Sequence, residues 1–253
     1  IFMKLLNITL LYFCLFFSSL VYPHNPEDFV ISEIEQGKLT FENEKIASEY
    51  NAALKRLRIR RINAMSWGEK NIIFIKAGFE HILPKGLDHI LFVLGLFFSC
   101  LKFSSLLLQV TAFTFAHSIT LILASQGLIQ IHGPLVEALI ALSIVWIAIE
   151  NCMFKKPNNW RPIVVFTFGL LHGLGFASVL SNYGLPKDNF ISLLLAFNIG
   201  VEIGQLSVLI MAFILIKLTL NKSWKNKKLR IPVSILIGLV GLFWFSERII
   251  SLF

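Results

Sequence analysis

Two histidines and an aspartate flank a break between two apolar runs. In the stretch GFEHILPKGLDHILF, His81 precedes a Pro-Lys-Gly break, and the pair Asp88-His89 opens the next apolar run. Because proline and glycine end helices, His81 can fold back beside that pair. Imidazole and carboxylate suit borderline divalent ions such as Ni²⁺, Co²⁺ or Zn²⁺. Asp88 alone would be explained as a helix cap, but the two histidines beside it favour a metal site.

Histidines also lie inside two later apolar runs, where polar side chains must face protein or water. In and just before FTFAHSITL, a polar stripe recurs at helical spacing, made of Thr111, Thr114, His117 and Ser118. Thr and Ser can bond to their own helix backbone, whereas His117 cannot, so His117 is a candidate ligand. His172 lies among glycines in FGLLHGLGFA. It is either a ligand or a hydrogen-bonded histidine within a helix-packing motif.

The run FNIGVEIGQL carries the most specific helical pattern, because Asn198, Glu202 and Gln205 share one helix face. An intramembrane glutamate aligned with two amides indicates a site or an ion route. The alternative is that these side chains only form hydrogen bonds between helices.

The run EALIALSIVWIAIEN adds polar residues near both of its ends. Glu137 lies near the outer end, and Ser143, Glu150 and Asn151 lie toward the inner end. Glu150 has an alternative interpretation as an interfacial residue near basic side chains.

Depth along each helix orders these groups into a polar ladder across the membrane. The candidate metal ligands are His81, Asp88, His89, His117, His172 and Glu202. The residues expected along a route or around the site are Thr114, Ser118, Glu137, Ser143, Glu150, Asn151, Asn198 and Gln205. The three cysteines form no CxxC pair, so the sequence predicts neither a disulfide nor a thiolate metal site.

Membrane helices must position these residues, because 56% of the 253 residues are hydrophobic and only 15% are charged. The chain is therefore expected to be an all-α, polytopic bundle of about six transmembrane helices. The expected spans are approximately Leu87–Leu101, Ser104–Ala124, Pro134–Phe154, Pro162–Ser181, Phe190–Lys217 and Ile231–Ile250. The first of them is short for a hydrocarbon core of roughly 30 Å.

The positions of the basic residues predict orientation in a bacterial inner membrane. The net charge is +8, but Lys and Arg lie between the apolar runs, which favours a topological role over nucleic-acid binding. Lys102, the group from Lys155 to Arg161 and the group from Lys217 to Arg230 fall in loops that would be cytoplasmic. The loops on the other side, SQGLIQIHG and SNYGLPKD, contain only Lys187.

The amino-terminal part predicts export. Residues 3–22 are expected to be a signal peptide or an uncleaved anchor. Residues 23–86 are expected to form a periplasmic, juxtamembrane helical segment, in which 71–83 is an interfacial amphipathic helix. Residues 87–253 are then the six-helix transmembrane domain.

Five ordered stretches resemble the HupE/UreJ family of membrane proteins: GFEHILPKGLDHILFVLGL, FTFAHSITL, EALIALSIVWIAIEN, FGLLHGLGFA and AFNIGVEIGQL. The resemblance covers about Gly78 to Leu206 and implies a nickel or cobalt permease that supplies hydrogenase or urease maturation. It also implies metallochaperones of that maturation as partners. The family's His-spacer-Asp-His motif corresponds to His81, Asp88 and His89, with a spacer one residue longer than usual. A second motif, with two histidines and a glutamate on one helix, is missing, which suggests a divergent branch.

Three hypotheses follow from these residues. The leading one is a secondary permease for Ni²⁺ or Co²⁺ that uses the ladder as its path. A second is a membrane-embedded zinc hydrolase, with histidines holding Zn²⁺ and Asp88 or Glu202 as general base. A third is an accessory protein in which these groups only pack helices. Histidines that converge on one pocket would favour the hydrolase, and residues spread along a route would favour transport. The sequence contains no nucleotide-binding loop, so ATP-driven pumping by this chain is not expected.

Overall fold

The computed structural model describes residues 44–100, 102–129, 131–154, 159–183, 189–219 and 229–252, and these residues form helices and no strand. The expected signal peptide or anchor at 3–22, and the expected segment up to residue 43, lie outside the described residues. The helices are α3 (Glu44–Ala64), α4 (Trp67–Ile82), α5 (Leu87–Ser99), α6 (Phe103–Ser125), α7 (Gly133–Met153), α8 (Arg161–Tyr183), α9 (Phe190–Thr219) and α10 (Arg230–Ile250).

The helices α6, α7, α9 and α10 are each long and apolar enough to cross a membrane. The pair α4 and α5 passes the same test only as one unit, which is bent by 69° at the break between the two helices. The part of α8 from Arg161 to Ala177 is a shorter apolar helix. The prediction of an all-α membrane bundle is therefore confirmed, and the expected number of spans agrees roughly with the helices described.

The bend between α4 and α5 explains why the first expected span was short. Helix α5 has 13 residues, which is about 20 Å at 1.5 Å per residue, less than a hydrocarbon core. Helix α4 begins at a capping box made by Ser66 and Glu69. It ends before Pro84 and Gly86, and a Cβ on Gly86 would overlap the carbonyl oxygen of His81. Glycine at position 86 therefore lets the chain turn tightly from α4 into α5.

Helix α4 packs against α9, where glycines bring the two backbones together. A Cβ on Gly78 would overlap the carbonyl oxygen of Phe197, and one on Gly200 would overlap that of Ile75. Residues 71–83 are expected to be an interfacial helix, and what the sequence did not show is the contact with α9. Its reason is the small residues on both helices, which allow close approach in a membrane protein.

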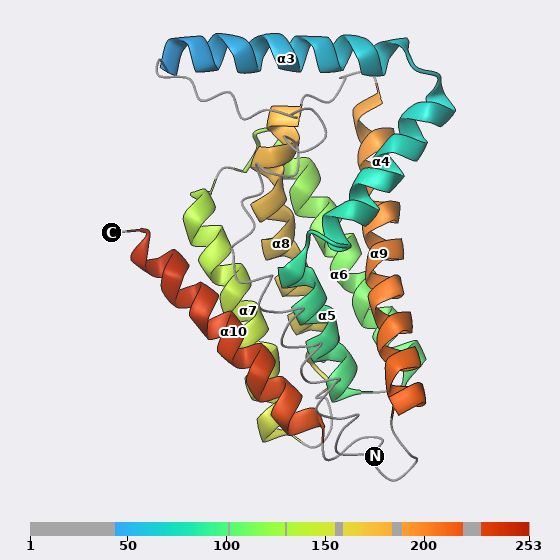
Figure 1. The fold of residues 1–253 in the computed structure, drawn as a ribbon, viewed down its shortest axis with the longest axis vertical. Helices are drawn as coiled ribbons and strands as arrows, with labels where there is room; N and C mark the ends of the chain where they lie inside the picture. Colours follow the sequence, from blue (N-terminus) through green and yellow to red (C-terminus); the bar gives the residue numbers. More distant parts are fainter. Residues whose placement is uncertain are drawn as a thin grey trace.

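Helix α5 lies at the centre of the bundle, with α6, α7, α9 and α10 around it (Figure 1). Seven of its residues are buried, including His89, Phe92 and Phe97, so this short helix is enclosed by protein. Large apolar side chains such as Phe115, Trp146 and Leu195 are instead exposed on the outside of the bundle, as expected for contact with lipid. Helix α3, drawn in blue, crosses one end of the bundle (Figure 1).

Candidate metal centre

Three imidazoles from three helices converge at the bend between α4 and α5. His81 lies in the last turn of α4, His89 in the first turn of α5 and His117 in α6. Each offers one possible ligand atom, and these atoms lie within 4.8 Å of one another. We call His81, His89 and His117 the histidine trio. Because the break between α4 and α5 is short, His81 before it and His89 after it lie with their ring centroids 4.9 Å apart.

The hydrogen bonds of His89 and His117 leave one ring nitrogen of each available as a ligand. His89 Nδ1 lies 3.0 Å from Oδ1 of Asp88, and His117 Nδ1 lies 3.1 Å from Oδ1 of Asn198. Asn198 donates through Nδ2 to the carbonyl oxygen of Leu194, which fixes its Oδ1 as the acceptor for His117. Both Nδ1 atoms therefore carry the proton. The lone pairs are at Nε2, where neither histidine has a hydrogen-bond partner.

His172 on α8 lies beside the trio with the same tautomer. Its Nδ1 donates to the carbonyl oxygen of Phe168 at 2.8 Å, and its buried Nε2 has no hydrogen-bond partner. The centroid of its ring lies 4.8 Å from that of His89. The group of mutually close ligand atoms does not include His172. His172 is therefore a neighbour of the trio, which an ion could reach from His89.

Phenylalanine rings enclose the histidines. The ring of Phe176 lies 4.2 Å from that of His81, and the ring of Phe113 lies 4.9 Å from that of His172, centroid to centroid. Phe92 and Phe197 also contact this group. Such surroundings exclude bulk water and strengthen interactions between a bound ion and its ligands.

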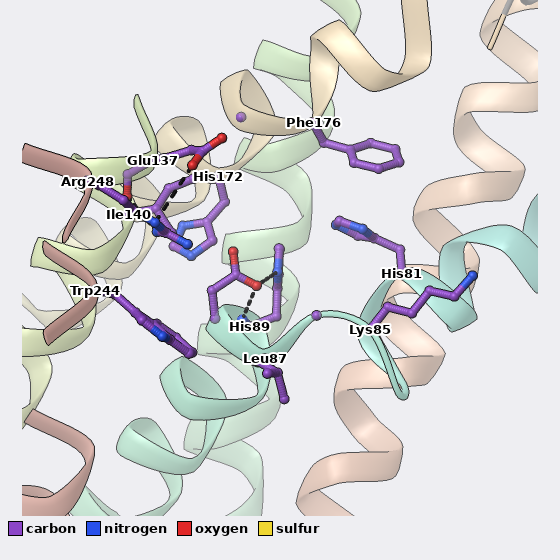
Figure 2. A pocket seen from close by; sticks show the side chains of 13 residues that line it. His81, Lys85, Leu87, His89, Glu137, Ile140, His172, Phe176, Trp244 and Arg248 are labelled. Carbon is purple, nitrogen blue, oxygen red and sulfur yellow. Dashed lines mark hydrogen bonds and ion pairs between the residues drawn. The ribbon is translucent and has the colours of Figure 1, made fainter. Parts of the chain in front are cut away.

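A cavity of about 70 Å³ opens at the histidines, which is room for a few water molecules (Figure 2). Its polar wall includes His81, Asp88, His89 and His172. Glu137, Lys85 and Arg248 line it as well, together with Trp244. Sequence reasoning missed Lys85, Trp244 and Arg248. A basic residue in the last turn of an apolar helix was the available signal for Arg248.

The structure places Glu202 outside the trio. Its Oε1 accepts a hydrogen bond of 2.6 Å from Thr111 Oγ1, across the contact between α6 and α9. One turn away on the same two helices, Thr114 Oγ1 donates to Gln205 Oε1 at 3.0 Å. These contacts and the His117–Asn198 contact form a polar seam between α6 and α9, which we call the α6–α9 seam.

Two of the expected polar residues satisfy their own helices. Ser118 Oγ donates to the carbonyl oxygen of Thr114 at 2.7 Å. Ser143 Oγ donates to that of Ile140 at 2.7 Å. The structure gives neither of them a contact with the trio.

Glu150 and Asn151 belong to a second polar cluster, near the opposite end of α5 from His89. Arg161 is almost fully buried, with its Nη1 3.5 Å from Oε2 of Glu150 and its guanidinium 3.4 Å from Oδ1 of Asn151. Asn151 also donates to the carbonyl oxygen of Gly95 on α5. The ladder expected from the sequence is therefore divided between a histidine centre, a lateral seam and a buried arginine cluster.

Comparison with known proteins identifies the family. A family model described as HupE / UreJ protein matches residues 57–248. No curated protein and no solved structure gave a match. The matched range runs from α3 to the last turn of α10 and includes the trio, His172 and the cavity. Because the match spans well over half of the chain, this protein belongs to the HupE/UreJ family.

Proposed function

We propose that this chain is a bacterial inner-membrane permease for a divalent transition-metal ion, Ni²⁺ or Co²⁺, and that the histidine trio is where the ion binds. Membership of the HupE/UreJ family supports an accessory role related to nickel or cobalt transport. The family match carries the choice of transport, and the ligand atoms of His81, His89 and His117, which lie within 4.8 Å of one another, support the trio as the place where the ion binds.

The chemistry of the donors supports the choice of ion. Neutral imidazoles bind Ni²⁺, Co²⁺ and Zn²⁺ well, and they bind alkali and alkaline-earth ions poorly. Asp88 and Asn198 orient two of the rings, in the manner of the outer partners of metal-ligating histidines. The ion is the substrate, so it must also leave the trio. A neutral ligand set leaves the ion's charge largely uncompensated and so favours exchange over permanent retention.

The route after the trio is proposed to follow the α6–α9 seam. Asn198, which holds His117, lies one helical turn from Glu202 and two turns from Gln205. The side of the membrane with most of the loop lysines is taken as the cytoplasm, and the segment before α4 as periplasmic. Ions leaving the seam would reach the cytoplasmic side. Metallochaperones of hydrogenase or urease maturation are the proposed recipients.

A membrane-embedded zinc hydrolase is the second candidate, and one observation favours it. His81 and His89 line one cavity and lie close to His117, as in catalytic zinc sites with three protein ligands, instead of spreading along a route. Asp88 lines that cavity and would be the base in such a site, whereas Glu202 bonds to Thr111 in the seam.

Uptake into proteoliposomes tests the two candidates against each other. Wild type should accumulate Ni²⁺ or Co²⁺, and His89→Ala and His117→Ala should accumulate little. Glu247→Gln is the control, because Glu247 is exposed in the last turns of α10 and does not line the cavity. Normal accumulation by both histidine variants would refute the permease. A wild type that accumulates no ion but purifies with one tightly held Zn²⁺ would favour the hydrolase.

A further inference from the structure

Glu137 is the most exposed acidic side chain that lines the cavity, and Arg248 lies beside it. Glu137 is near the start of α7 and Arg248 is in the last turn of α10, and both line the cavity. The side chain of Glu137 is 36% exposed, compared with 26% for Asp88 and 3% for His89. Figure 2 shows the pair on one side of the cavity, His172 and His89 near it, and His81 on the opposite side. An ion entering from solvent would meet Glu137 before the trio.

The contact between these two side chains is loose. Arg248 Nε lies 3.7 Å from Glu137 Oε2, which is too long for a hydrogen bond. Arg248 instead donates through Nη1 to the backbone carbonyl oxygen of Glu137 at 2.7 Å, and its guanidinium lies 5.7 Å from the centroid of the Trp244 ring. The arginine is therefore anchored by the backbone and by Trp244. The carboxylate is held mainly by charge, so it can turn toward another cation without losing a hydrogen bond to Arg248.

We infer that Glu137 is the capture residue for the divalent cation, and that Arg248 neutralises it while the cavity holds no ion. This inference rests on the proposed function, since it assigns the entry step of the same site. A divalent ion carries twice the charge of a guanidinium and attracts the carboxylate more strongly at equal distance. Arg248 keeps its backbone and Trp244 contacts when the carboxylate turns away.

His172 supplies the next step toward the trio. It lines the same cavity, its Nε2 is buried without a hydrogen-bond partner, and its ring is adjacent to that of His89. An ion held by Glu137 can exchange oxygen for imidazole at His172 and then pass to His89. Glu137 is not among the residues whose ligand atoms meet at one point, so its effect is on the rate of entry and exit and not on the final affinity.

Stopped-flow binding of Co²⁺ to the purified full-length protein tests this inference, because histidine ligation changes the visible absorbance of Co²⁺. In Glu137→Gln, association should slow by about tenfold, because the carboxylate that receives the entering ion is lost. Dissociation should slow equally, so the equilibrium affinity stays constant. Association in wild type should also fall more steeply with ionic strength than in the variant. In Arg248→Gln, association should be faster than in wild type.

Glu247→Gln is the matched control. It removes one negative charge, as Glu137→Gln does, but from the position before Arg248 on α10, which does not line the cavity. Equal slowing in Glu137→Gln and Glu247→Gln would overturn the inference, because general surface charge would then explain both. Unchanged association in Glu137→Gln would also overturn it, as would a lost equilibrium affinity, which would make Glu137 a ligand of the final site. If wild type binds no Co²⁺, the proposed function itself fails. If wild type binds Co²⁺ and Glu137→Gln binds it at the same rate, only the capture step is refuted.

Discussion

Asp88 holds the residue that follows it, His89, through two contacts. Its Oδ1 lies 3.0 Å from His89 Nδ1 and also accepts the backbone N–H of His89 at 2.8 Å. Gly86 is the N-cap residue of α5, so Asp88 lies inside the first turn, where it accepts one backbone N–H and fixes the imidazole tautomer of His89. The helix-cap interpretation of Asp88 is therefore wrong, and both contacts of its carboxylate oxygen are made with His89.

Replacing Asp88 by Asn should weaken metal binding while the three imidazoles remain. An amide keeps the size of the side chain but removes the negative charge that makes His89 a stronger ligand and fixes its orientation. Loss of such an outer partner typically costs 10- to 100-fold in metal affinity, and we expect a loss of about that size. Equilibrium dialysis with Ni²⁺ measures it, with Glu247→Gln as the charge control. Equal affinity in Asp88→Asn and wild type would mean that His89 does not ligate the ion.

Replacing Glu202 by Gln should separate binding from transport. Because Glu202 bonds to Thr111 and lies outside the trio, Glu202→Gln should bind Ni²⁺ with wild-type affinity. If the α6–α9 seam is the route, its rate of uptake into proteoliposomes should fall severalfold, since the carboxylate that would accept the ion is lost. His117→Ala provides the contrast and should lose affinity as well. A Glu202→Gln variant that transports at the wild-type rate would exclude the seam as the route.

Periodicity and local chemistry predicted much of this site. The Pro-Lys-Gly break correctly suggested that His81 returns beside Asp88 and His89, since a tight turn must bring its two flanks together. The polar stripes on 114–118 and 198–205 met as neighbours on α6 and α9, because intramembrane polar side chains must find partners in other helices. The membrane class and the all-α fold followed from apolar runs of sufficient length.

Other features could not be read from one chain. Helix α4 looked interfacial because its composition is amphipathic, but its glycines pair with those of α9, and such pairing depends on which helix lies opposite. Depth along separate helices suggested an even ladder and could not show that Glu202 points into the seam while His172 points into the cavity. Arg248 lies more than 150 residues from His89 in the sequence, so only the packing of α10 reveals that both line one cavity.

Replacing Gly200 by Ala should destabilise the protein and weaken the site. The new Cβ would overlap the backbone carbonyl oxygen of Ile75, so α4 and α9 would have to separate. We expect the free energy of unfolding to fall by about 1–3 kcal/mol, as for other overpacked contacts. Ni²⁺ affinity should also fall because α4 carries His81. Thermal unfolding in detergent measures the first effect. Gly68→Ala is the control, since a Cβ there meets nothing within 4 Å. Equal stability of the two variants would contradict the close helix crossing.

Replacing Asn151 by Ala should destabilise the bundle at the end away from the trio. Its Nδ2 donates to the carbonyl oxygen of Gly95 on α5 and to Ser234 Oγ on α10, and its Oδ1 lies 3.4 Å from the guanidinium of Arg161 on α8. One side chain on α7 thus joins four helices.

The alanine variant leaves the buried guanidinium of Arg161 with fewer partners, so the free energy of unfolding should fall by about 2–3 kcal/mol. Thermal unfolding measures this loss, with Ser246→Ala as the control because Ser246 is exposed and bonds only to its own helix. Asn151 also anchors the far end of α5, whose first turn carries Asp88 and His89. Ni²⁺ affinity should therefore fall in Asn151→Ala and not in Ser246→Ala, and unchanged affinity would show that α5 is positioned without this contact.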